Sequence, residues 1–107
     1  MIYELRTYYI MPGRMPDIED RFSRHTTGFF ERHGIKVVGF WTEIVGRNDT
    51  LVYITAFDSM ADREEKWKAF TSDPEWLKVR EETESNGPIV ARVENRFLQP
   101  TAFSPLE

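Results

Sequence analysis

Two histidines are the clearest candidates for proton transfer in this chain of 107 residues, which has no cysteine. His25 falls on the apolar stripe of a predicted helix, either as a core-edge histidine or as a general base facing a pocket. A histidine near the C-terminal end of a helix is favourable as a cation, which accounts for His33 without a functional role. Eight residues along a helix separate the two rings by about 12 Å, too far to share a metal ion. The sequence predicts no metal site and makes His25 the candidate catalytic residue.

Rings and charges inside predicted strands form the second group of candidates. Trp41 and Tyr53 provide apolar walls with a polar atom, although core packing and dimer contact also account for such rings. Glu4, Arg6 and Glu43 are either a solvated face with cross-strand ion pairs or the charged floor of a pocket that binds a carboxylate. The residue pattern leaves both interpretations open.

Composition excludes several classes of function. The net charge of −4 argues against a nucleic-acid partner, and no apolar run is long enough to span a membrane. Without cysteine there are no disulfides, thiolate metal sites or iron–sulfur clusters. No glycine-rich phosphate loop is present, so no nucleotide cofactor is expected. The N-terminus lacks a basic signal-peptide region, which predicts a cytoplasmic protein.

Periodicity and turn signals predict the elements that position these residues. Residues 2–10 alternate as a strand, and residues 14–33 repeat apolar side chains at steps of three and four, as in an amphipathic helix. Residues 35–45 and 51–57 read as two strands of a hairpin. Residues 59–86 predict one broken helix or two short ones, and residues 89–98 a last strand. The whole chain, residues 1–107, is therefore one α+β domain of ferredoxin-like β-α-β-β-α-β order with an antiparallel four-stranded sheet.

One face of such a sheet has no helices over it. The predicted strands carry apolar residues on both faces, so we expect a second copy of the chain to cover the open face as a two-fold homodimer. A mixed aromatic and charged cavity between the two sheets is then the expected ligand site. We place Trp41 and Tyr53 in its walls, with Glu43, or Glu4 and Arg6, as its polar contacts.

Several motifs resemble the NIPSNAP family domain over essentially the whole chain. They are Met1-Ile2-Tyr3-Glu4-Leu5-Arg6-Thr7-Tyr8 with Pro12-Gly13, Arg32-His33-Gly34, Val38-Gly39-Phe40-Trp41, Trp67-Lys68-Ala69-Phe70, Asp73-Pro74-Glu75-Trp76 and Leu98-Gln99-Pro100. The resemblance implies a dimeric α/β barrel, a superfamily that also includes cofactor-independent monooxygenases, haem-binding enzymes and isomerases. It implies no particular reaction, because the family has no accepted catalytic residue set and fold alone does not decide activity.

Two functions remain as hypotheses. The first is a homodimer that binds or converts a small organic molecule without metal, nucleotide or other cofactor, with a monooxygenase-like or isomerase-like activity if it is an enzyme. The second is a non-catalytic dimeric interaction domain, which the lack of a strong catalytic motif favours.

Overall fold

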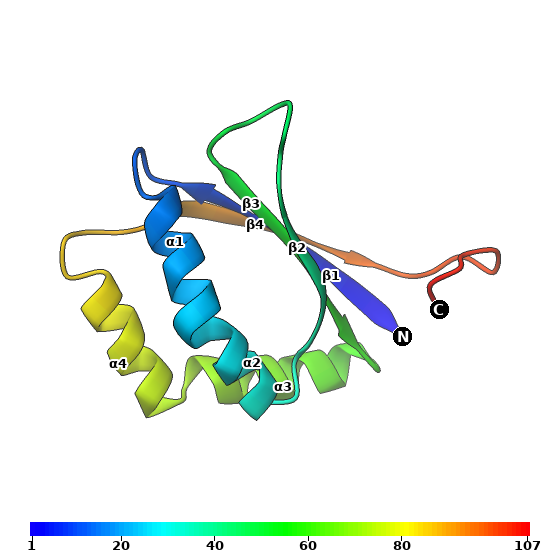
Figure 1. The fold of residues 1–107 in the computed structure, drawn as a ribbon. Coiled ribbons are helices and arrows are strands. Elements are labelled where there is room, and N and C mark those ends of the chain that lie inside the picture. Colours follow the sequence, from blue (N-terminus) through cyan, green and yellow to red (C-terminus); the bar gives the residue numbers. More distant parts are fainter.

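The strands of the computed structural model, which describes residues 1–107, form one antiparallel sheet (Figure 1). The strands are β1 (Ile2–Ile10), β2 (Lys36–Thr42), β3 (Thr50–Phe57) and β4 (Val90–Leu98), in the spatial order β2-β3-β1-β4. The central strands are thus the first and third in sequence. This confirms the predicted ferredoxin-like arrangement.

The helices all cover the same face of this sheet (Figure 1). They are α1 (Met15–Arg21), a π-helical turn (Phe22–Thr26), α2 (Thr27–Arg32), α3 (Met60–Thr71) and α4 (Pro74–Thr83). The predicted helix of residues 14–33 is therefore interrupted by one wide turn, and residues 59–86 form two helices. None of these helices has both the length and the apolar character required to cross a membrane.

Side-chain caps separate the last two helices. The Ser59 hydroxyl accepts a hydrogen bond from the Asp62 amide at 3.1 Å at the start of α3. Asp73 accepts from the Glu75 amide at 2.9 Å at the start of α4. Asp73 also bonds the His33 ring at 2.7 Å. His33 thus ties the end of α2 to the start of α4, in keeping with a structural role.

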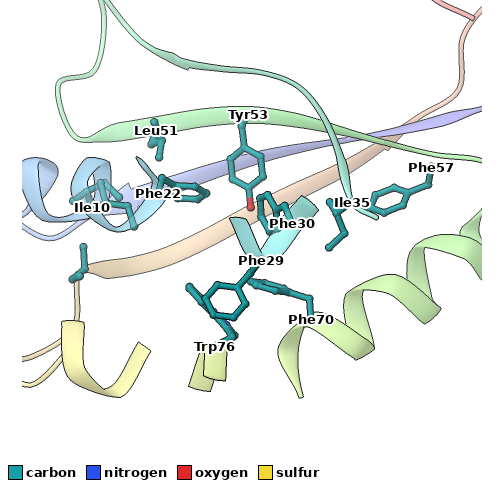
Figure 2. Packing of buried hydrophobic residues seen from close by; sticks show 12 residues of the cluster. Ile10, Phe22, Phe29, Phe30, Ile35, Leu51, Tyr53, Phe57, Phe70 and Trp76 are labelled. Carbon is teal, nitrogen blue, oxygen red and sulfur yellow. The ribbon is translucent and has the colours of Figure 1, made fainter. Parts of the chain in front are cut away.

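The core lies between sheet and helices and consists largely of aromatic rings (Figure 2). Tyr53 points from β3 toward Phe30 of α2, with ring centroids 6.0 Å apart. Phe70 of α3 and Trp76 of α4 are closer still, at 4.8 Å. Burial of such rings is a dominant favourable contribution to folding. It also explains where much of the high aromatic content of the chain resides.

A β-bulge in β2 changes which of its side chains face the helices. The register against β3 shifts between Val37 and Gly39, and Val37 and Phe40 both pack against the core. Strict alternation would place Val37 and Phe40 on opposite faces, but the bulge adds a residue to the strand and brings both to the helix side. The Trp41 ring lies along Gly39, where an added Cβ would be 2.9 Å from it.

Strand β1 turns its charged residues toward the helices. Glu4 lies opposite Thr55 and Arg6 opposite Tyr53 on β3, and both charged residues are buried. Their expected position on the open face is therefore wrong. Because side chains alternate along a strand, the burial of Ile10 in the core forces Glu4 and Arg6 to the same side.

The opposite face of the sheet has no helix over it (Figure 1). Leu5 and Ile54 lie half-buried near its centre, opposite each other on β1 and β3. Trp41 and Leu98 toward its edges are exposed to 49% and 42%. The β2–β3 loop rises away from the helices, and its Ile44 is fully exposed. This side of the sheet is thus apolar around β3, while its β4 edge carries the charged residues Arg92, Glu94 and Arg96 opposite β1.

Candidate functional site

A cleft of about 310 Å³ opens between β1, β4 and the helices α1, α3 and α4. Its deeper residues are aromatic or cationic: Arg6, Tyr8, Arg21, Trp67, Phe70 and Trp76. Arg80 and Glu84 are more exposed and lie toward the rim, whereas the Arg92 side chain pairs with Glu94 and lies over the Tyr9 ring on the face away from the helices. The cleft therefore combines ring walls with a concentration of positive charge.

Arg6 is fixed at one side of the cleft by three neighbours. Its Nε donates to the Tyr53 hydroxyl at 2.8 Å, and its Nη1 donates to Glu4 Oε2 at 2.8 Å. The guanidinium carbon lies 4.3 Å from the centre of the Trp67 ring, a cation–π distance. Burial alone would lower the pKa of Arg6, but the oxygens of Tyr53, Tyr8 and Glu4 outweigh it and raise the pKa. The guanidinium carbon also lies 5.5 Å from the centre of the Tyr8 ring.

The Glu4 carboxylate fixes the position of the Arg6 guanidinium. Its carboxylate has no exposed surface and accepts bonds from Arg6 Nη1, Arg63 Nε and Nη2, and Asn95 Nδ2, at 2.8 to 3.0 Å. Burial acts to raise the pKa of Glu4, but the bonds from Arg63, Asn95 and Arg6 prevail, so the pKa is lowered from 4.5. The carboxylate therefore serves as an anchor rather than as a proton donor.

Acid should destabilise the protein through this carboxylate. Because the folded-state pKa of Glu4 is lowered, its stabilising contribution is complete above pH 4.5 and is lost as the pH falls through the folded value. We expect the urea midpoint of the wild type to fall as the pH drops below 4.5. A midpoint that does not change below this pH would contradict the assignment.

Arg21 is a second buried cation at the end of α1, and it is poorly paired. It is 6% exposed, and its Nη1 lies 3.3 Å from the Thr83 hydroxyl and 3.6 Å from Glu84 Oε2. Its Nε is buried without any hydrogen-bond partner. Burial lowers the pKa of Arg21, opposed by Glu84 and Tyr8, yet a guanidinium stays charged. A buried donor without a partner destabilises the folded protein.

Tyr8 and Tyr53 connect the cleft to the core. Their hydroxyl oxygens are 2.9 Å apart, and their rings meet edge to face at 5.4 Å. Tyr53 is fully buried, which together with Tyr8 raises its pKa well above 10.0, although Arg6 opposes this shift. It therefore keeps its hydrogen. Tyr8 is half-buried and lines the cleft.

The structure brings together only part of the predicted site. Glu4, Arg6 and Tyr53 form one bonded group, but on the helix side of the sheet and with Tyr53 in the core rather than in a wall. Trp41 lies across the sheet from them and borders a separate apolar groove beside the π-helical turn. The predicted grouping of Trp41 with these three residues on one face is wrong.

Glu43 and His25 also lie apart from the cleft. Glu43 closes the β2–β3 loop, accepting from the Thr50 hydroxyl at 2.6 Å, and Gly46 has no room for a Cβ beside this carboxylate. His25 is half-buried in the π-helical turn and is not among the residues that line the cleft or the apolar groove. The structure gives neither residue a place in the candidate site.

The sequence patterns did not identify Arg21, Tyr8, Trp67 and Trp76 as site residues. Arg21 had a detectable signal, since it follows Ile18 by three positions and adjoins Phe22 on the apolar stripe, where a charge is unusual. Tyr8 shares the alternating face of Glu4 and Arg6. Only the folded structure shows that Arg21 of α1 and Tyr8 of β1 line the same cleft.

Similarity to known proteins extends over nearly the whole chain. The NIPSNAP family model matches residues 3–105. Protein NipSnap of Drosophila melanogaster is 30% identical over 104 residues, which are 97% of this chain and 36% of that protein. Protein NipSnap homolog 1 of Danio rerio is 29% identical over 106 residues, 99% of this chain and 36% of that protein. The chain thus spans about a third of the length of these relatives.

Solved structures give the same relationship. An uncharacterized NIPSNAP domain protein from Burkholderia xenovorans has a TM-score of 0.86 at 27% identity, covering 98% of this chain and 99% of that one. A NIPSNAP family protein with unknown function from Agrobacterium tumefaciens has a TM-score of 0.88 at 29% identity, covering 100% and 94%. These matches confirm the resemblance that the sequence motifs carry.

More distant structures share the fold alone. A putative antibiotic biosynthesis monooxygenase from Nitrosomonas europaea has a TM-score of 0.65 at 10% identity over 94% of this chain and 98% of that one. SnoaB, a cofactor-independent oxygenase from Streptomyces nogalater, has a TM-score of 0.62 at 13% identity, covering 97% and 96%. The fold is thus one that supports small-molecule chemistry in other proteins, without transferring that chemistry.

Proposed function

Because the chain belongs to the NIPSNAP family, whose solved members include a protein of unknown function, we propose its function from the site itself. It is a homodimer in which each chain binds a small organic anion, in the cleft between sheet and helices. The observation that carries the proposal is the pair of buried arginines, Arg6 and Arg21, that line one aromatic-walled cleft. Guanidinium groups are well suited to bind carboxylates.

The walls favour a flat ligand. Trp67 lies against the Arg6 guanidinium and Trp76 lies 5.6 Å from that of Arg21, so each ring adjoins one cation. A ring placed between these walls gains apolar contact while its anionic group meets the cations. An aromatic carboxylate fulfils both conditions within about 310 Å³.

Calorimetric titration with 2-naphthoate tests this proposal directly. We expect saturable binding of one molecule per chain, and binding at least about tenfold weaker for the uncharged analogue 2-naphthalenemethanol, since it lacks the charge that satisfies the arginines. Absence of naphthoate binding to the wild-type protein, or equal affinity for both compounds, would refute an anion site in this cleft.

The homodimer rests on the uncovered face of the sheet. Leu5 and Ile54 at its centre, with the more exposed Trp41 and Leu98, form an apolar surface to which a two-fold copy is the simplest cover. The ligand cleft lies on the opposite side of the sheet, so dimerisation leaves it accessible. A non-catalytic interaction domain would use the same face but would not need the cleft.

Substitution of Ile54 by arginine tests the dimer. We expect light scattering to give a mass of about twice 12.7 kDa for the wild type and about 12.7 kDa for Ile54→Arg, because the new charges are buried in the interface. Leu77→Arg is the matched control, since Leu77 is 46% exposed on α4, away from this face. A wild-type mass near 12.7 kDa would contradict the proposal.

A further inference from the structure

In the hydrogen bond between the Tyr8 and Tyr53 hydroxyls, the surrounding groups fix which oxygen donates, and this determines what Tyr8 can offer to a ligand. We infer that Tyr8 is a specificity-determining residue, whose hydroxyl donates to an oxygen anion carried by an aromatic ligand in the cleft. This inference rests on the proposed anion-binding function. It names the ligand class as an aromatic carboxylate or enolate and excludes ligands that must donate a hydrogen at that position.

The direction follows from what each group is able to donate. Arg6 Nε has only a hydrogen to offer, so in its 2.8 Å contact the Tyr53 oxygen is the acceptor. Tyr53 then has one hydrogen to place, and it has no exposed surface from which to reach water. The only other hydrogen-bond partner of its hydroxyl is that of Tyr8, at 2.9 Å. Tyr53 therefore donates to Tyr8.

The hydrogen of Tyr8 is consequently left unused within the chain. If Tyr8 donated to Tyr53 instead, the Tyr53 hydrogen would be stranded in the core without an acceptor, an arrangement that folded proteins avoid. Tyr8 is half-buried and lines the cleft, so its free hydrogen is available to a molecule there. Arg6 thus donates to Tyr53, Tyr53 donates to Tyr8, and the Tyr8 hydroxyl is left to donate to the ligand.

The two buried arginines that line the cleft with Tyr8 are cationic, and Glu84 is the one carboxylate in the lining. The Arg6 guanidinium carbon lies 5.5 Å from the centre of the Tyr8 ring, and the unpartnered Nε of Arg21 lies in the same cleft wall. A negatively charged acceptor is attracted by both cations and accepts from Tyr8, whereas an ammonium group faces two cations and a donor. The rings of Trp67 and Trp76 favour an anion attached to a flat system.

Removal of the Tyr8 hydroxyl tests the inference. We expect Tyr8→Phe to bind 2-naphthoate about tenfold more weakly, while its affinity for 2-naphthalenemethanol changes little. Tyr9→Phe is the matched control, because the Tyr9 hydroxyl bonds Glu94 on the other face of the sheet, and it should bind naphthoate normally. A Tyr8→Phe protein with wild-type naphthoate affinity, or one that weakens both compounds equally, would overturn the role of Tyr8.

A second measurement uses the unaltered protein and so does not depend on how a variant folds. With ¹³Cζ-labelled tyrosine, addition of 2-naphthoate should shift the NMR signals of Tyr8 and, through the shared hydrogen bond, of Tyr53, while that of Tyr9 stays fixed. Binding of naphthoate without a shift at Tyr8 would overturn the inference and leave the anion site standing. Failure of the wild type to bind naphthoate at all would instead refute the proposed function.

Discussion

Glu4→Gln should destabilise the protein by about 3–5 kcal/mol, the cost of removing one partner from a buried ionic group. The amide has no charge with which to balance Arg6 and Arg63, and its own N–H₂ group would meet donors where Glu4 has only acceptors. Urea unfolding followed by circular dichroism measures this change. Because two-state domains of this size have little stability in reserve, the variant should be largely unfolded at moderate temperature.

Glu94→Gln serves as the control for this experiment. Glu94 also pairs with an arginine, Arg92, in the same sheet, but both side chains are about half exposed. Exposed pairs contribute little, so the urea curve of this variant should overlay that of the wild type. If both substitutions proved equally mild, the buried group around Glu4 would not be the anchor described above.

Arg21→Met should have opposite effects on stability and on binding. Methionine keeps an unbranched apolar stem beside Trp76 but removes the buried Nε that has no partner, so the free energy of unfolding should rise by about 1 kcal/mol. Affinity for 2-naphthoate should fall about 30-fold, because one of the two cations is lost. Glu84 keeps Arg80 as its ionic partner at 3.1 Å.

Arg24→Met distinguishes this effect from a general loss of charge. Arg24 lies only three residues further along the same helical run, but its side chain is 71% exposed and is not part of the cleft. Both its stability and its naphthoate affinity should remain at wild-type values. A loss of stability in Arg21→Met with unchanged affinity would show that Arg21 is a structural cation and not part of a binding site.

The order of elements could be predicted from local signals. Gly34 ends the first helical run, and the Asp73-Pro74 pair marks the start of α4, as cap chemistry requires. The bulge at Val38 had no such signal, because it arises from pairing with β3. Alternation along β2 alone therefore separates Val37 from Phe40, although the bulge turns both side chains toward the core.

The position of the site depended on contacts that local patterns do not contain. From sequence, Glu4 and Arg6 fit either a solvated face or the floor of a pocket on the open side of the sheet, because charged residues are rarely buried without partners. Their partners Arg63 and Asn95 lie 59 and 91 residues from Glu4 in the chain. Only the folded arrangement brings them within hydrogen-bond distance, so the correct face of β1 could not be read from its own nine residues.

The buried carboxylate of Glu4 also constrains how the chain can fold. A shift of β1 by one residue against its neighbours would turn Leu5 toward the helices and Glu4 toward solvent, because successive side chains point to opposite faces. Arg63 on α3 and Asn95 on β4 would then both lose their acceptor in the core. The ionic group thus penalises misaligned sheets more heavily than an all-apolar core would, and it couples strand alignment to the docking of α3.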